Sequence, residues 1–132
     1  MSDYAIVNLL ELDDAVGDRV DGLEARFSRT AIESRDLGVS LFQYGPGVRP
    51  PFSHKHREQE EAYVVVRGSG RIRLGDEVRE LKLWDVVRVA PEVVRGFEGG
   101  PDGLDVIAIG GPKPEGGDGE TVEAAWPEAG AS

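Results

Sequence analysis

Short runs of apolar residues, most of them alternating with polar ones, recur along this chain and are separated by turn-forming residues. Residues 71–74 and 78–83 alternate charged and apolar side chains on either side of Gly75-Asp-Glu, which is typical of a β-hairpin. Residues 4–12 fit a strand or a short helix equally well. Further strands are predicted around the two histidines and at residues 23–32, 39–44, 62–66, 86–89, 94–98 and 104–109. Evenly spaced short strands of this kind predict an all-β sandwich or barrel.

The stretch between residues 47 and 70 contains both histidines of the chain, His54 and His56. Side chains two residues apart in a strand point to the same face, so the two imidazoles should lie side by side. Glu61 follows and opens an apolar run rich in β-branched residues. Two imidazoles and one carboxylate around one point form the ligand set used by non-haem iron and related divalent metals. The spacing therefore predicts a metal site at His54, His56 and Glu61.

This stretch resembles the first motif of the cupin superfamily, usually written G-x5-H-x-H-x3-4-E-x6-G. The residues that match its spacing are His54, His56, Glu61 and Gly68. Gly47 stands one residue too far from His54 for a complete match. The resemblance covers residues 39–110 and implies a single-domain, all-β protein with an RmlC-like jelly-roll barrel, of the small conserved-barrel type of cupin.

The chain divides into three parts on this interpretation. Residues 1–38 are expected to pack on the barrel as an N-terminal segment, and residues 39–110 form the barrel itself. Residues 111–132 are rich in Gly, Pro and Glu and are expected to be a tail with little regular structure. Trp126 is the exception, because an exposed indole is costly and a Trp in a polar tail indicates docking.

The family's second motif supplies one more histidine ligand, but the matching stretch here, residues 84–97, has Arg95 in its place. Arginine is cationic at neutral pH and cannot coordinate a metal. Two interpretations remain open. In the first, one divalent ion (Fe, Mn, Ni or Zn) stays on His54, His56 and Glu61, and Arg95 anchors a substrate anion beside it. In the second, Arg95 pairs with Glu61 and the pocket is metal-free. Arg95 should share a cavity with Glu61 in either case.

Ligand contacts are expected from residues around this site. Tyr63 shares the strand parity of Glu61, and Phe52 shares that of the histidines. The predicted ligand-binding residues are Arg95, Tyr63, Phe52 and Phe97. One functional hypothesis is a metal-dependent oxygenase or isomerase that acts on a small oxygenated or anionic molecule. The other is a metal-free cupin that binds a small molecule without catalysis.

Composition narrows the classes of partner. The 132 residues suit one domain, and the net charge of −10 disfavours binding to nucleic acid or to anionic membranes. The chain has no cysteine, which excludes disulfides, thiolate metal sites and a cysteine nucleophile. The first residues lack the basic segment followed by an apolar segment that is typical of a signal peptide. We therefore expect a cytoplasmic protein without a signal peptide.

The outer face of the strand after Glu61 is also apolar. Ala62, Val64 and Val66 alternate with Tyr63 and Val65, so both faces of this strand are expected to be buried. The outer face would be covered by the N-terminal segment or by a second subunit. Small cupins are commonly dimers, and the resemblance therefore implies a homodimer.

Overall fold

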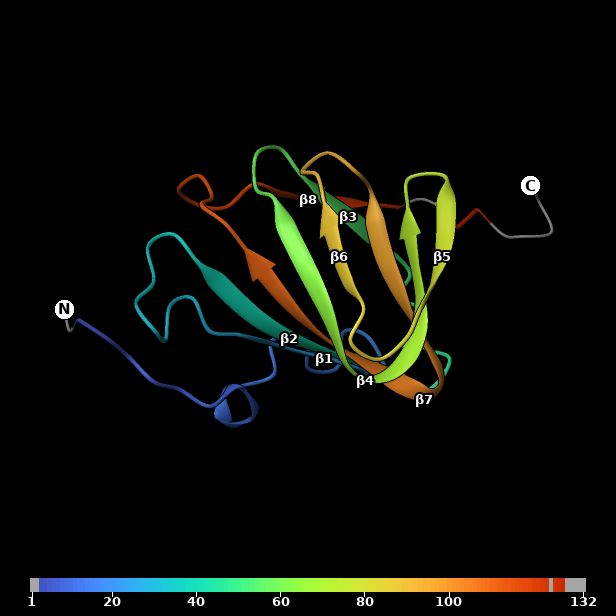
Figure 1. Ribbon diagram of the computed structural model, residues 1–132, viewed down its shortest axis with the longest axis horizontal. Coiled ribbons are helices and arrows are strands. Elements are labelled where there is room, and N and C mark those ends of the chain that lie inside the picture. Colours follow the sequence, from blue (N-terminus) through green and yellow to red (C-terminus); the bar gives the residue numbers. More distant parts are fainter. Residues whose placement is uncertain (1–2, 124, 128–132) are drawn as a thin grey trace.

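The computed structural model describes residues 3–123 and 125–127. Within them lies an all-β structure with one short 3-10 helix (Figure 1), which confirms the predicted fold class. The elements are η1 (Leu9–Glu11), β1 (Leu23–Phe27), β2 (Gly38–Tyr44), β3 (Ser53–His56), β4 (Glu61–Leu74), β5 (Glu77–Leu81), β6 (Val86–Val89), β7 (Arg95–Gly110) and β8 (Gly119–Val122). No helix among these residues is long and apolar enough to cross a membrane.

Two long strands, β4 and β7, form the centre of an antiparallel sheet that curls round a common interior (Figure 1). β4 pairs with β6 near its start and with β5 near its end. β7 pairs with β2, which in turn pairs with β1, and its first residue pairs with β3. β3 also pairs with β8. The site described below lies where β3, the start of β4 and the start of β7 meet.

The glycines after residue 66 bend a strand instead of ending it. The predicted runs 62–66 and 71–74 are parts of one strand, β4, which carries bulges between Val65 and Gly70. Gly68 has a φ of 71° at this bend, and a Cβ there would overlap the carbonyl oxygen of Gly103. Residues 99–103, between the predicted strands 94–98 and 104–109, likewise lie inside β7, because the two bends pair with each other across the sheet.

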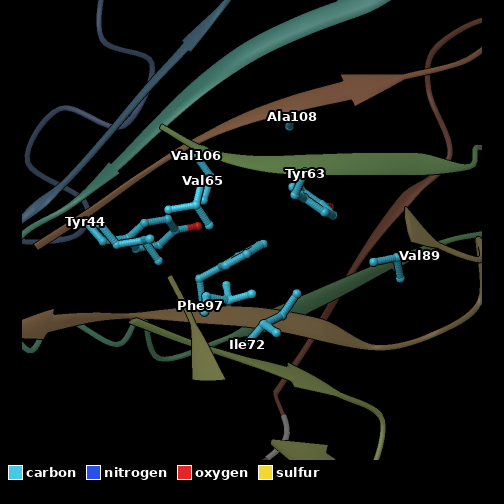
Figure 2. Packing of buried hydrophobic residues seen from close by; sticks show 10 residues of the cluster. Tyr44, Tyr63, Val65, Ile72, Val89, Phe97, Val106 and Ala108 are labelled. Atoms are coloured by element: carbon cyan, nitrogen blue, oxygen red, sulfur yellow. The ribbon is translucent and has the colours of Figure 1, made fainter. Parts of the chain in front are cut away.

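One apolar cluster packs in the interior of the curled sheet (Figure 2). Tyr63 packs edge-on against Phe97 with ring centroids 4.9 Å apart, and Phe97 also contacts Tyr44. The cluster consists of Tyr44, Tyr63, Val65, Ile72, Leu81, Val89, Phe97, Leu104, Val106 and Ala108. The hydroxyl of Tyr63 leaves this cluster and reaches Glu61, so the apolar core and the polar site share a wall.

Both flanking segments contribute strands to the sheet. β1 lies within residues 1–38 and pairs with β2 along its whole length, whereas residues 4–12 contain only η1. The expectation of a tail with little regular structure is wrong over β8, which pairs with β3 and places Thr121 opposite His54. Trp126 is buried, as expected, and the Arg49 guanidinium lies 4.3 Å from its ring centroid. A polar composition did not reveal β8, because a short edge strand needs few apolar residues.

Candidate metal centre

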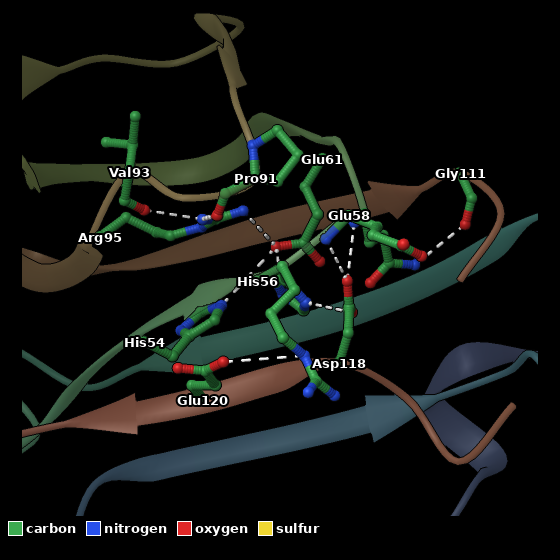
Figure 3. A network of polar contacts seen from close by, with 12 residues as sticks. His54, His56, Glu58, Glu61, Pro91, Val93, Arg95, Gly111, Asp118 and Glu120 are labelled. Atoms are coloured by element: carbon green, nitrogen blue, oxygen red, sulfur yellow. Dashed lines mark hydrogen bonds and ion pairs between the residues drawn. The ribbon is translucent and has the colours of Figure 1, made fainter. Parts of the chain in front are cut away.

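The predicted triad converges in the structure. β3 carries His54 and His56 on the same face, and Glu61 is the first residue of β4. One potential ligand atom from each residue lies within 4.8 Å of the others. The Nε2 atoms of His54 and His56 are 3.6 Å and 3.1 Å from Glu61 Oε1. The two imidazoles meet at nearly a right angle, with centroids 5.3 Å apart. The structure thus brings together the three residues that the sequence motif selected (Figure 3).

Asp118 orients His56 from the side opposite to Glu61. Its Oδ1 lies 2.9 Å from His56 Nδ1, and its Oδ2 accepts hydrogen bonds from the backbone N–H groups of Glu58 and Gln59 at 2.6 Å and 2.8 Å. Burial raises the pKa of Asp118, but the bonds from Glu58, His56 and Gln59 outweigh it and hold the pKa at about 2. An ionised carboxylate can only accept, so Nδ1 of His56 is the donor and Nε2 faces Glu61. Carboxylates hold metal-binding imidazoles in this way.

Sequence reasoning missed Asp118. It lies in the glycine-rich stretch that was expected to be a tail, 62 residues beyond His56. An isolated Asp between glycines has no spacing that indicates a role. Only the pairing of β8 with β3 carries Asp118 to the imidazole, and Asp118 in turn holds the β3–β4 connection through its two backbone bonds.

Glu61 is the electrostatic centre of the site. Burial raises the pKa of Glu61, but hydrogen bonds from His54, His56 and Tyr63 lower it by more than burial raises it. The pKa of Glu61 therefore lies well below the usual range. The same contact with Glu61 raises the pKa of His56 above its usual value, against the opposing effect of burial. Burial and the nearby Glu61 charge raise the pKa of Tyr63 well above that of free tyrosine, so the phenol remains protonated and donates to Glu61.

Arg95 contacts Glu61 as predicted, but it does not line the cavity that Glu61 lines. Its side chain is completely buried, and Nη2 donates to Glu61 Oε1 at 3.1 Å. Nη1 donates to the carbonyl oxygens of Pro91 and Val93 at 2.9 Å and 2.7 Å, and Nε donates to the Tyr63 hydroxyl at 3.2 Å. All three nitrogens are therefore engaged within the protein. Arg95 and the histidines approach Glu61 from different sides (Figure 3).

A cavity of about 530 Å³ opens beside the triad, a size that suits a small molecule. His54, His56 and Glu61 all line it, and so does Phe52, which is 42% exposed. The other predicted ligand-binding residues are not among its lining residues. Arg95 and Tyr63 lie behind Glu61, and Phe97 is buried in the apolar cluster. Strand parity predicts that Phe97 points into the barrel. It does not distinguish the part of the interior that side chains fill from the part that is an open cavity.

Comparison with known proteins gives a consistent fold. No family model matches the sequence, and no curated protein matches it. Among solved structures, a cupin protein from Bacteroides fragilis is similar, with a TM-score of 0.70, 22% identity and coverage of 85% of this chain and 86% of that one. The polyketide cyclase RemF from Streptomyces resistomycificus has a TM-score of 0.73 at 15% identity, with 96% and 89% of the two chains covered. A sugar phosphate isomerase of the cupin superfamily from Silicibacter pomeroyi has a TM-score of 0.68 at 16% identity, with 83% and 77% covered. The chain has the cupin fold, as the first motif implied.

Proposed function

We propose that this cupin-fold protein binds one divalent metal ion through His54, His56 and Glu61 and uses it to act on a small oxygenated or anionic molecule. The observation that carries the proposal is the convergence of the three potential ligand atoms within 4.8 Å beside a cavity of about 530 Å³. Isomerisation and oxidation are the reaction classes that fit. Similar structures that are an isomerase and a cyclase by name support action on an oxygenated molecule.

The residues present fit such an ion. Two imidazole nitrogens and one carboxylate suit Fe, Mn, Ni or Zn, and the ionised Asp118 fixes the His56 tautomer that presents Nε2. When bound, the ion would supply a Lewis acid for an oxygen of the substrate, or a centre for O2 chemistry. The chain's own contribution is to hold Glu61 ionised, through Tyr63 and Arg95, and to leave one side of the triad open to the cavity.

A metal-free binding protein is the alternative, and one contact favours it. The Arg95 guanidinium already compensates the Glu61 charge at 3.1 Å, so the pair is electrostatically complete without an ion. A divalent ion would add a second positive charge near a buried guanidinium, which opposes binding unless an anion is also present. The two functions therefore differ in metal affinity and share the cavity.

Elemental analysis of protein purified without chelator or histidine tag separates them. The chain has 2 histidines, both in the triad, so metal binding that depends on histidine must be at this site. We expect about one equivalent of metal, lost in His54→Ala and in Glu61→Gln. Glu60→Gln is the matched control, because it removes the same charge from an exposed neighbour that pairs with Arg88. Absence of metal in the purified protein, together with no binding on titration with Fe²⁺, Mn²⁺, Ni²⁺ or Zn²⁺, would favour the metal-free function.

The outer face of the sheet supports a homodimer, which we also propose. Val86 on β6 is 66% exposed and pairs in register with Val64 on β4, and Ile109 on β7 is 40% exposed and pairs with Ala62. These side chains alternate with the buried ones and form an apolar patch across three strands, beside the exposed ion pair of Arg88 with Glu60. A second copy of the chain would bury this face against its own equivalent.

A further inference from the structure

The cavity wall beside Glu61 contains two glycines that other side chains overlie. Gly110 on β7 pairs with Glu61, and Gly38 on β2 pairs with Gly110. A Cβ on Gly38 would lie 2.8 Å from Arg29 Nη2, and a Cβ on Gly110 would lie 2.6 Å from Gln59 Nε2. The Arg29 guanidinium and the Gln59 amide therefore occupy the space above these glycines. All of these residues line the same cavity as the triad.

Hydrogen bonds to backbone carbonyl oxygens hold the Arg29 guanidinium in place. Its Nη2 donates to the carbonyl oxygen of Gly111 at 3.0 Å, and Gln59 Nε2 donates to the same oxygen at 3.0 Å. Nη1 of Arg29 donates to the carbonyl of Arg35 at 3.3 Å. Two of the five N–H groups of Arg29 are used in these bonds, so the others can meet a ligand. Lys113, an exposed residue, lines the same cavity and adds a second cation.

Aromatic side chains border the remaining wall. Phe27 is 53% exposed, and Phe52 is 42% exposed, although both are large apolar residues. The Phe27 ring packs edge-on against Phe42 with centroids 5.6 Å apart, and all three rings line the cavity. Exposed aromatic rings beside a cavity offer a surface on which another ring can pack.

The distance between the two ends limits the ligand's size. Gly38 is two strands away from Glu61, which corresponds to about 10 Å between their Cα atoms. A one- or two-carbon acid spans only a small part of this backbone distance. A ring that carries a carboxylate spans more of this distance and also uses the phenylalanines.

We propose that the cavity binds an aromatic carboxylate, with the carboxylate on Arg29, the ring against Phe27 and Phe52, and the far end facing His54. The inference deepens the proposed function, on which it rests for the reactive end of the ligand. The carboxylate and ring contacts themselves use no metal. Guanidinium groups bind carboxylates through charge-assisted, often paired hydrogen bonds, which makes the charge of the ligand a testable requirement.

Calorimetric titration with benzoate tests the proposal, on metal-stripped and on metal-loaded protein. Benzamide is the neutral counterpart, cyclohexanecarboxylate lacks the aromatic ring, and acetate lacks any ring. We expect benzoate to bind more tightly than each of the three. Arg29→Gln should weaken benzoate about tenfold or more, as is usual when a hydrogen bond to a charged group is lost. Phe52→Ala should weaken it as well.

Arg79→Gln is the matched control, since Arg79 pairs with Glu77 on β5 and is not among the residues that line the cavity. Benzoate binding that equals benzamide binding, or that is unchanged in a folded Arg29→Gln variant, would overturn the proposal. If Arg29→Gln does not fold, the comparison of ligands on the unaltered protein still decides. Benzoate binding without any metal binding would support this inference and refute the metal-dependent function. Metal binding without benzoate binding would refute this inference and support the metal-dependent function.

Discussion

Replacing Arg95 with methionine should remove the charge that balances Glu61 while keeping much of the apolar stem. The Arg95 side chain is completely buried, and that of Glu61 is 14% exposed. Breaking a buried pair by removing one partner costs about 3–5 kcal/mol of unfolding free energy. We expect a value near the lower end, about 3 kcal/mol, because His54, His56 and Tyr63 still contact Glu61. This is a large part of the roughly 5–15 kcal/mol that stabilises a typical domain.

Urea denaturation, followed by tryptophan fluorescence, measures this free energy. A double-mutant cycle with Glu61→Gln isolates the pair, and its coupling should be about 1.5–3 kcal/mol, as for a hydrogen bond to a charged group. Arg79→Met serves as the control, because exposed pairs such as Arg79 with Glu77 contribute about 0–1 kcal/mol. A coupling below about 0.5 kcal/mol would refute the argument that Arg95 holds Glu61, since it would equal that of an exposed pair.

Three further predictions concern the metal site and the assembly. Asp118→Asn should weaken metal binding about 10–100-fold in competition with a chromophoric chelator, because Asp118 orients His56; unchanged affinity would contradict that role. Arg95→His should raise metal affinity in the same assay, because it removes a cation 3.1 Å from Glu61 Oε1 and adds an imidazole. If affinity stays the same, Arg95 does not oppose the metal. Val86→Arg should convert the proposed dimer to a monomer in light scattering at tens of micromolar, and a monomeric unaltered protein would rule the dimer out.

The sequence was informative where partners lie close together along the chain. His54, His56 and Glu61 fall within eight consecutive residues, and strand periodicity alone sends the two imidazoles to one face. The alternation of apolar and polar residues also identified most of the strands, since each strand must bury one face. The proximity of Arg95 to Glu61 followed from the motif, because Arg95 stands where that motif has a ligand, whereas their pairing was one of two interpretations that the sequence left open.

The tertiary structure decided the features that depend on pairing between distant segments. The glycines at 68–70 and 99–103 indicate either a turn that ends a strand or a bend within one, and local composition does not distinguish the two. Both segments are bends, because β4 and β7 pair with each other on either side of them. Asp118 reaches His56 only through the pairing of β8 with β3. Arg29 enters the cavity only because β2 places Gly38 in line with Glu61. Periodicity determines which face a side chain occupies, whereas its neighbours on that face depend on strand register, which the packing of the whole barrel sets.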